Sequence, residues 1–387
     1  MRASFIDKRI FFVHPSPTTL AQMTTFRVGG PVKHVVTAST ADEMAMAVHG
    51  ADEAGIPLLV IGGGSNLLVS DEPFEGVVVR DGRSKIIATQ PDPSGKVFVT
   101  ACAGTTWDDF VQWSIAQGLS GLEALSGIPG TVGAAPVQNI GAYGHEVAST
   151  LHSVRAWDRQ DEEMVVLSAK DLQLGYRTSI IKRSTGHGGT IESEAGQRIW
   201  GPTGRWVVVE ATFALEKSEL SAPVLYAELA TKLGVKAGER APSVMVREAV
   251  LGLRRGKGMV LDEGDHDSWS AGSFFTNPIL TRSQADVLPQ DAPRFGAGVD
   301  ADGVELVKTS AAWLIDHAGF GKGWALNGAD ASQAPASLST KHVLALTNRG
   351  SATAEDIREL ALAVRAGVEE RFGIRLVPEP VAVGFTW

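Results

Sequence analysis

Cysteine is almost absent from this 387-residue chain, which contains a single one, Cys102. One thiol excludes an intrachain disulfide, and the apolar run VFVTACAG around it predicts a buried strand residue. The chain also lacks any uninterrupted apolar stretch long enough to span a membrane, and its first ten residues, MRASFIDKRI, contain no apolar signal core. A cytoplasmic protein without membrane insertion is therefore expected.

Excess positive charge is missing as well, because 44 acidic residues outnumber 35 basic ones and give a net charge of −9. This balance argues against nonspecific binding to nucleic acid. The nine histidines lack the spacing of metal ligands and the acidic run DEGDHD (262–267) does not match the EF-hand pattern, so no metal is predicted. No sequence pattern supplies a Ser/His/Asp triad, and hydrolysis is not indicated.

Glycine, by contrast, is concentrated in one place. The eighteen residues GIPGTVGAAPVQNIGAYG (127–144) contain five glycines, two prolines and no charged side chain. Glycine allows a backbone to approach another molecule closely and to adopt positive φ, so this run predicts a ligand surface built from main chain. A buried, turn-rich connector is the alternative, but the run is long and apolar for such a role.

A second glycine loop, GGGSN (62–66), follows a predicted buried strand at 57–61. The residues after it, LLVSD and GVVVR, are again of strand type, whereas a dinucleotide-binding Rossmann turn opens a helix. Leu67 also occupies the last glycine position of G-x-G-x-x-G, and the segment Gly256-Lys257-Gly258 lacks the spacing and hydroxyl residue of a Walker A loop. We interpret GGGSN as a strand-to-strand phosphate cradle, with a tight glycine turn as the alternative.

The remaining pattern mixes helices and strands without regular alternation, which predicts an α+β protein of more than one domain. A helix is expected from Thr105 or Thr106, with Asp108 placed for a capping box and Gly118 as a stop. The last helix, 354–372, begins after a Thr353 cap and ends at Gly373. Further helices are expected at 42–55 and about 243–255, strands at 97–103, 153–158, 163–167 and 206–215, and a variable surface excursion at 184–204.

Three polar constellations stand apart from the glycine loops: GYRTS with Arg177, AGSFFTNP with Ser273, and LVPEPV with Glu379. Taken singly, each has a plain explanation, since an arginine commonly pairs on the surface, a serine commonly caps or fills, and one carboxylate between prolines is a weak signal. A basic cluster at 247–257 recurs at helical spacing and fits either a solvated helix end or a diphosphate site.

Seven motifs taken in order resemble the UDP-N-acetylenolpyruvoylglucosamine reductase family: TTFRVGG (24–30), IGGGSNLLV, GLEALSGIPGTVGAAPVQNIGAYG, GYRTS, AGSFFTNP, AAWLID (311–316) and the closing PEP. The resemblance runs from about residue 20 to the end. The segment SAPVLYAEL, which contains Tyr226, is similar to the tyrosine-bearing loop of the branch with the larger substrate domain.

This resemblance implies an FAD-binding fold of the vanillyl-alcohol-oxidase type in two subdomains, 1–83 with 372–387 returning to it and 84–258, plus an α+β substrate-binding domain at 259–371. It implies a noncovalently bound FAD that is reduced by NADPH. The reduced FAD then reduces an enolpyruvyl UDP-sugar to UDP-N-acetylmuramate for peptidoglycan synthesis. Cell wall biogenesis, cell shape, cell division and the cell cycle are the processes implied. No obligate protein partner is predicted.

By the same correspondence, Arg177 and Glu379 act at the substrate carboxylate, and Ser273 donates a proton to the adjacent carbon. The predicted substrate-binding residues are Tyr143, Tyr226, Arg254, Lys257, Asn277 and Lys308. The predicted FAD contacts are Gly62, Gly63, Gly64, Ser65, Asn66, Leu67, Gly127, Ile128, Pro129, Gly130, Gly133, Ala134, Gln138, Asn139, Gly141 and Ala142.

The chain departs from the family pattern at LSTKHVLAL (338–346). Many relatives carry a VH pair before QAL, whereas this chain has Ser339 at the histidine and His342 at the glutamine. No ligand contact is therefore carried over to this segment. Two rival functions remain: a flavin oxidase of the same fold, although the histidine or cysteine that often tethers flavin is absent from both glycine loops, and a nonenzymatic flavin- or UDP-sugar-binding regulator.

Overall fold

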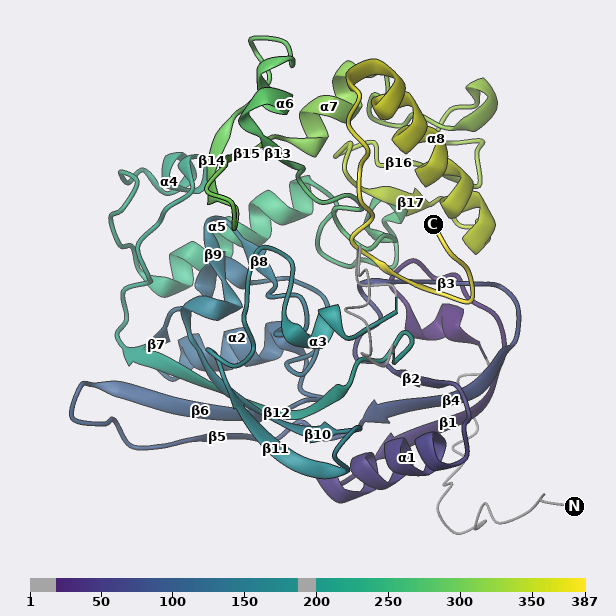
Figure 1. The fold of residues 1–387 in the computed structure, drawn as a ribbon. Coiled ribbons are helices and arrows are strands. Elements are labelled where there is room, and N and C mark those ends of the chain that lie inside the picture. The colour runs from purple at the N-terminus through teal and green to yellow at the C-terminus, as the bar shows by residue number, and fades with distance from the viewer. Residues whose placement is uncertain (1–18, 187–199) are drawn as a thin grey trace, which may run out of the picture. The chain divides into compact units, whose positions relative to one another are not determined.

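The computed structural model describes residues 19–186 and 200–387, which form two compact units (Figure 1). Of the described residues, unit 1 contains 19–23, 30–64, 72–186 and 200–256, and unit 2 contains 24–29, 65–71 and 257–387. The chain therefore passes from unit 1 to unit 2 within the GGGSN loop. The division into domains at 1–83 with 372–387, 84–258 and 259–371 stays a prediction.

Unit 1 is built on two sheets. The first is parallel, with the strand order β1 (Val32–Ala38), β4 (Phe74–Asp81), β2 (Leu58–Val60). The second is antiparallel, with the order β11 (Glu163–Ser168), β10 (Leu151–Asp158), β12 (Trp206–Lys217), β6 (Lys96–Cys102), β5 (Ile86–Ala88), and β7 (Leu119–Ser120) also pairs with β12. The other elements are α1 (Ala41–Glu53), α2 (Trp107–Ala116), α3 (Ile180–Arg183), α4 (Ala227–Leu233), α5 (Ser243–Gly256), the hairpin of β8 (Gly141–Ala142) and β9 (His145–Glu146), and the 3-10 turns Leu20–Met23, Glu123–Leu125 and Val147–Ser149.

Two apolar cores hold unit 1 together. Helix α1 lies along β1 and β4 (Figure 1) and buries Met44 and Val48 against valines of these strands and of β12. Helix α2 buries Trp107 and Phe110 against Phe213 of β12, with ring centroids 5.0 to 5.9 Å apart. Burying aromatic side chains of this size dominates the energetics of a core. The start of α2 is thereby fixed on the larger sheet.

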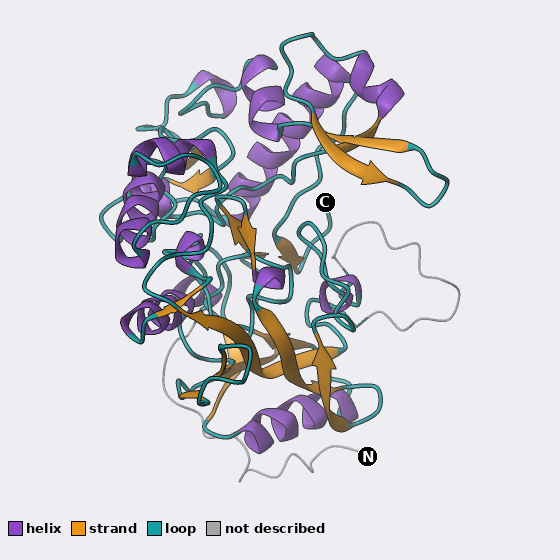
Figure 2. Cartoon of the chain, turned by 90° about the vertical axis from the view of Figure 1, so that its left-hand side faces the viewer, coloured by secondary structure: helices purple, strands orange, loops and turns teal. Residues whose placement is uncertain are grey.

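Unit 2 has three small sheets. Strand β3 (Leu67–Val69) pairs in parallel with β18 (Val381–Val383), so the end of the chain returns beside the GGGSN loop. The other sheets are antiparallel: β13 (Ile279–Thr281), β15 (Glu305–Lys308) and β14 (Phe295–Val299) in that order, and β16 (Ala336–Leu338) with β17 (Leu346–Asn348). The helical elements are α6 (Arg282–Asp286), α7 (Ala311–His317), α8 (Ala354–Phe372), and the 3-10 turns His266–Ser268 and Leu326–Gly328. Figure 2 shows the interspersed helices and strands in a view turned by 90°.

The cap signals of two helices had different outcomes. Helix α8 begins and ends as predicted, with a capping box between Thr353 and Asp356 and a left-handed Gly373 at φ 69°. At α2 the predicted capping box is wrong, because Thr106 makes no side-chain cap hydrogen bond and the buried Thr105 Oγ1 has no hydrogen-bond partner among the described residues. The Asp108 carboxylate instead accepts a hydrogen bond from the Gly127 backbone N–H at 2.6 Å.

Two further expectations concern exposure. Cys102 is the last residue of β6 and is buried, as predicted. In the expected surface excursion, residues 187–199 lie outside the described residues. Over residues 19–186 and 200–387, no helix is both long and apolar enough to cross a membrane.

Candidate cofactor and substrate site

The two glycine loops meet within unit 1. A Cβ added to Gly63 would lie 2.7 Å from the Gly130 Cα, and one added to Gly62 would lie 2.5 Å from the Thr131 Oγ1. Carbon atoms of real side chains do not approach neighbours this closely, since favourable contacts lie near 3.5–4.0 Å. At Gly63 the loops therefore touch backbone to backbone, which explains why glycine is required at this position.

The wall formed by residues 127–144 is fixed by the end of β6 and the start of α2. The Trp107 N–H donates to the Gly130 carbonyl at 3.0 Å, and the Gly133 N–H donates to the Ala103 carbonyl at 3.0 Å. Gly127 and Gly130 have positive φ of 70° and 128°. These conformations are open to glycine at no steric cost. Backbone hydrogen bonds thus set the position of the wall.

The GGGSN loop connects strand β2 to strand β3, which confirms the strand-to-strand prediction. Gly62, Gly63 and Gly64 belong to unit 1, and Ser65, Asn66 and Leu67 belong to unit 2. Within unit 2, the Asn66 Nδ2 donates to the Glu379 carbonyl at 3.3 Å, and the Val381 N–H donates to the Asn66 carbonyl at 2.9 Å. The end of this loop is therefore tied to the segment that carries Glu379.

Four predicted ligand residues come together in unit 1. The rings of Tyr143 and Tyr226 meet edge to face with centroids 5.6 Å apart. Burial raises the pKa of Tyr143 to about 12, and the nearby positive charge of Arg254 opposes this rise. Burial lowers the pKa of Arg254 to about 10, to which the positive charge of Arg177 adds. Arg254 stays positively charged at neutral pH and is suited to hold an anion.

Arg177 sits in a strained turn. Its φ is 55°, in the left-handed region that residues other than glycine rarely adopt. Reciprocal backbone hydrogen bonds between Gly175 and Thr178 close the turn at 3.0 and 3.2 Å. The Arg177 Nη2 reaches across to donate to the Gly141 carbonyl at 3.1 Å. The guanidinium is thereby directed to the hairpin of β8 and β9, which carries Tyr143.

The basic cluster at 247–257 separates into residues with different surroundings. Arg247 forms two hydrogen bonds with the Asp108 carboxylate, at 2.6 and 2.8 Å, and so joins α5 to α2. Burial alone would raise the pKa of Asp108, but the hydrogen bonds from Arg247 and Gly127 lower it below its ordinary value. Arg247 has a structural partner, Arg254 lies beside Tyr143, and Lys257 begins the main segment of unit 2.

A buried carboxylate supports the same helix. Glu123 accepts hydrogen bonds from the Gly121 N–H at 3.0 Å and from the Ser243 Oγ at 3.1 Å, at the first residue of α5. Burial raises the pKa of Glu123, and these hydrogen bonds oppose the rise. Helix α5 is therefore held to the 3-10 turn Glu123–Leu125 by Glu123 and to α2 by Arg247, and these contacts position Arg254.

In unit 2, Ser273 and Glu379 lie on adjacent segments. The Glu379 N–H donates to the carbonyl of Phe274, the residue after Ser273, at 2.8 Å, and the Thr276 N–H donates to the Val377 carbonyl at 3.0 Å. Phe274 is fully buried and packs edge to face on Phe26. Ser273 itself is partly exposed, and Glu379 is 7% exposed. The core thus holds the segment of Ser273, the predicted proton donor, beside the segment of Glu379, which is predicted to act at the substrate carboxylate.

Asn277 and Lys308 form another pair in unit 2. The Asn277 Oδ1 accepts a hydrogen bond from the Ala311 N–H at the start of α7, at 3.0 Å. Lys308 ends β15, where it pairs with Ile279, two residues after Asn277. Both residues therefore lie at the same end of the β13–β15 strand pair.

The side chains of two predicted FAD contacts form hydrogen bonds with other residues of the protein. The Asn139 side chain is bonded to Glu146, Gly175 and Ala148, and the residue is only 1% exposed. The Gln138 Oε1 accepts a hydrogen bond from the Lys182 Nζ at 3.0 Å. A contact of Asn139 with FAD is therefore possible only through its backbone. No local pattern in the sequence predicts these partners, because they lie between 7 and 44 residues away along the chain.

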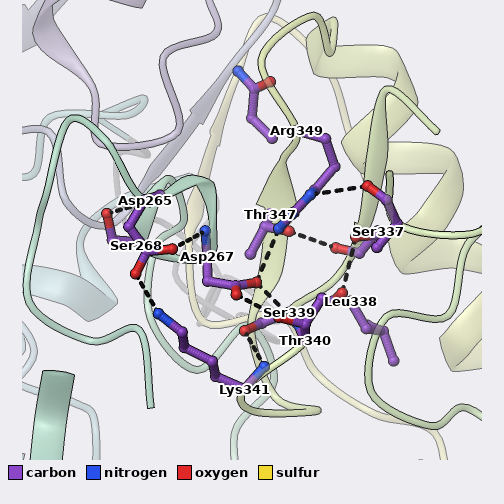
Figure 3. A network of polar contacts seen from close by, with 12 residues as sticks. Asp265, Asp267, Ser268, Ser337, Leu338, Ser339, Thr340, Lys341, Thr347 and Arg349 are labelled. Carbon is purple, nitrogen blue, oxygen red and sulfur yellow. Dashed lines mark hydrogen bonds and ion pairs between the residues drawn. The ribbon is translucent and has the colours of Figure 1, made fainter. Parts of the chain in front are cut away.

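The segment that departs from the family pattern forms a polar network in unit 2 (Figure 3). The Ser339 Oγ accepts hydrogen bonds from the Lys341 and His342 N–H groups at 3.0 and 3.3 Å, and Ser339 is fully buried. Asp267 accepts hydrogen bonds from Thr340 and Arg349. Burial alone would raise the pKa of Asp267, but these partners lower it. Ser339 therefore stabilises a turn.

The acidic run 262–267 takes part in the same network. The Lys341 Nζ donates to the Asp265 carboxylate at 2.5 Å, and the Asp262 carboxylate accepts from the Gly264 N–H. These carboxylates thus serve loop structure. Across the two described stretches of the chain, histidine, cysteine, aspartate and glutamate form no group of three that could hold a metal ion.

The two glycine loops carry no charged side chain and meet where an added Cβ would obstruct them, so their exposed backbone suits an anionic or planar ligand. Residues 32–168 match the family model described as FAD binding domain, and this match identifies the class as an FAD-binding protein. The predicted α+β class with an FAD-binding fold is confirmed. Residues 264–383 match a second model, described as UDP-N-acetylenolpyruvoylglucosamine reductase, C-terminal domain.

Whole-chain comparisons agree. The UDP-N-acetylenolpyruvoylglucosamine reductases of Cutibacterium acnes and Streptomyces coelicolor are each 48% identical to this chain, covering 95% and 96% of it and 89% and 90% of the relatives. The crystal structure of the corresponding reductase from Thermus caldophilus superposes with a TM-score of 0.59 at 25% identity, covering 94% of this chain and 97% of that one. The chain belongs to the UDP-N-acetylenolpyruvoylglucosamine reductase family, as its motifs predicted.

Proposed function

We propose that this protein is a cytoplasmic, NADPH-dependent reductase that converts UDP-N-acetyl-3-O-(1-carboxyvinyl)-glucosamine to UDP-N-acetylmuramate through noncovalent FAD. Near-half identity over 95% of the chain and the FAD-binding domain support the reaction. The observation that carries the proposal is the pairing of the Ser273 and Glu379 segments beside the end of the GGGSN loop. The same proposal includes roles in cell wall biogenesis, cell shape, cell division and the cell cycle, without an obligate protein partner.

The cofactor fits the residues present. The two glycine loops would hold FAD through backbone groups of residues 62–67 and of the wall at 127–144. When bound, FAD supplies hydride transfer from NADPH to the terminal carbon of the enolpyruvyl ether. Because Ser273 and Glu379 lie outside both glycine loops, loss of their substrate contacts is separable from loss of FAD.

The chemistry left to the protein is charge stabilisation and proton transfer. Hydride addition at the terminal carbon pushes an electron pair onto the adjacent carbon and its carboxylate. Arg177 supplies a fixed positive charge for that carboxylate, and Glu379 orients it. Ser273 then donates its hydroxyl proton to the adjacent carbon, which forms the new C–H bond. Serine is a weak acid, but a carbanion is a strong base, so the transfer is favourable once water is excluded.

The remaining polar residues suit the nucleotide part of the substrate. Arg254 carries a positive charge with a pKa of about 10 and lies near Tyr143, whose ring packs against that of Tyr226. We assign the diphosphate and sugar to this group together with Lys257, Asn277 and Lys308. NADPH also presents a diphosphate, so the same residues would serve each ligand in turn.

The variant Ser273→Ala tests the reaction. We expect reduction of the flavin by NADPH to stay within about twofold of the wild-type rate, and reoxidation by the enolpyruvyl sugar nucleotide to fall by at least about a hundredfold. Stopped-flow absorbance of the flavin measures both half-reactions. The matched control is Ser270→Ala in the same segment, whose hydroxyl accepts a hydrogen bond from the Gly272 N–H.

Two outcomes would contradict the proposal. If the wild-type flavin, reduced by NADPH, is not reoxidised by the enolpyruvyl sugar nucleotide, the protein is not this reductase. If Ser273→Ala slows both half-reactions equally, Ser273 is not the proton donor. A regulatory flavoprotein without catalysis would show no substrate-dependent reoxidation in any variant.

A further inference from the structure

Tyr143 and Arg177 are held in strained backbone conformations on two separate segments. Tyr143 and Gly144 form the two-residue turn between β8 and β9, with φ of 51° and 84°. Positive φ at both positions is the pattern of a type I′ hairpin turn, in which asparagine or glycine is preferred over tyrosine. Arg177 has a φ of 55° in its own turn. Such conformations persist only where the surrounding structure fixes them.

One side chain is bonded to both segments. The Asn139 Nδ2 donates to the Glu146 Oε2 of β9 at 2.7 Å and to the Gly175 carbonyl of the Arg177 turn at 3.0 Å. Its Oδ1 accepts from the Ala148 N–H at 2.9 Å. An amide has two N–H donors and one carbonyl acceptor, so these partners use all three groups and fix the amide orientation.

Because Asn139 is buried, the loss of these hydrogen bonds is costly in free energy. The residue is 1% exposed, and a buried acceptor that loses its donor carries the full cost of desolvation. The Gly175 carbonyl also accepts the hydrogen bond that closes the Arg177 turn, and the Arg177 guanidinium bonds to Gly141 of the hairpin. The hairpin and the turn are thus linked once through Asn139 and once through Arg177 itself.

We propose that Asn139 is a positioning residue, which holds Arg177 where the charge on the substrate carboxylate develops. This inference rests on the proposed function. Asn139 acts through the Gly175 turn and makes no contact with the reacting atoms. Its loss therefore affects the half-reaction that needs Arg177, which is reoxidation by the enolpyruvyl nucleotide. Flavin reduction by NADPH develops no charge at that carboxylate.

The variant Asn139→Asp tests this role, because it keeps the size of the side chain and replaces the two N–H donors by an oxygen. A carboxylate at this position faces the Glu146 carboxylate and the Gly175 carbonyl, so both links become repulsive. We expect reoxidation by the enolpyruvyl nucleotide to slow by at least about tenfold, with FAD retained and flavin reduction by NADPH within about twofold of wild type.

The double variant Asn139→Asp/Glu146→Gln separates the two links. The amide introduced at position 146 can donate to the new carboxylate and restores the link to the hairpin, while the Gly175 carbonyl still faces an oxygen. We expect the melting temperature to recover in part and reoxidation to stay slow. Full recovery of reoxidation would overturn the inference, since it would show that the link to the Arg177 turn is dispensable.

The matched control is Asn348→Asp in unit 2. Asn348 is also buried, at 3% exposed, and its amide bonds to backbone groups, including the Phe26 carbonyl and the Gly350 N–H. We expect a lower melting temperature with the ratio of the two half-reaction rates unchanged. A selective loss of reoxidation in Asn348→Asp, or an equal loss of both half-reactions in Asn139→Asp, would overturn the positioning role. Wild-type turnover separates this failure from failure of the proposed function.

Discussion

The approach of Gly63 to Gly130 allows the cofactor cradle to be tested with a single methyl group. In Gly63→Ala, the added Cβ would lie 2.7 Å from the Gly130 Cα and 3.2 Å from the Gly130 N. Carbon–carbon contacts are favourable near 3.5–4.0 Å, so the two loops must separate by roughly 1 Å. Both obstructing atoms are backbone, and no side-chain rotation relieves the clash.

The wall resists this displacement more than the GGGSN loop does. The Gly130 carbonyl accepts a hydrogen bond from the Trp107 N–H, and the neighbouring Val132 and Gly133 are bonded to Thr105 and Ala103. The GGGSN loop is therefore the part that moves. Overpacking of this kind costs about 1–3 kcal/mol. If that cost appears in cofactor binding, the Kd for FAD rises by about 5-fold to 150-fold, since 1.4 kcal/mol corresponds to a factor of ten.

Titration of the apoprotein with FAD, followed by quenching of flavin fluorescence, measures this change. The control is Gly50→Ala in α1, where an added Cβ meets no atom within 4 Å. Alanine is favoured over glycine in a helix interior by up to about 1 kcal/mol, so this variant is expected to be more stable and to bind FAD normally. If Gly63→Ala binds FAD within about twofold of wild type, the glycine loops do not form the cofactor cradle.

Two further predictions follow from titrating groups. In Arg254→Lys the introduced side chain has an ordinary pKa of about 10.4, so the same burial moves its titration to roughly pH 7–9. The KM of this variant for the UDP-sugar should therefore rise with pH in that range, whereas the KM of the wild type should stay constant up to about pH 10. Identical pH profiles of KM would contradict this placement of Arg254. The lowered pKa of Asp108 contributes stability that is lost as pH falls below about 4. In urea titrations at pH 7, Asp108→Asn should lower the free energy of unfolding by about 1–3 kcal/mol, and this free energy should depend less on pH in the acid range than in wild type. An unchanged dependence on acid pH would refute this linkage.

The sequence predicts local structure well where the signal and its partner are close together. Helix α8 has its capping box within four residues and its glycine stop directly after its last turn, and both are present. The start of α2 offers a similar signal, but there the Asp108 carboxylate binds Gly127 and Arg247, which are 19 and 139 residues away. A tertiary partner of this kind leaves no trace in the local pattern.

The same distinction applies to the candidate site. The failure of the Rossmann spacing and the strand-like residues after GGGSN were enough to predict a strand-to-strand loop, because both are local properties. The meeting of Gly63 with Gly130 is not local, and neither is the link from Asn139 to Gly175, which spans 36 residues. The residue types pointed to backbone contacts with a ligand, but only the tertiary structure shows which side chains support that backbone.

The distribution of positive φ separates two roles on the same surface. Where a left-handed conformation serves only to shape the wall, the chain uses glycine, as at Gly127 and Gly130. At Asn139, Tyr143 and Arg177 the conformation is equally left-handed, yet each position carries a side chain. Glycine there would remove a strain of about 1–3 kcal/mol per residue. Stability alone therefore does not explain these three side chains, whereas the proposed roles of Tyr143 at the substrate, of Arg177 at its carboxylate and of Asn139 in linking the two turns do explain them.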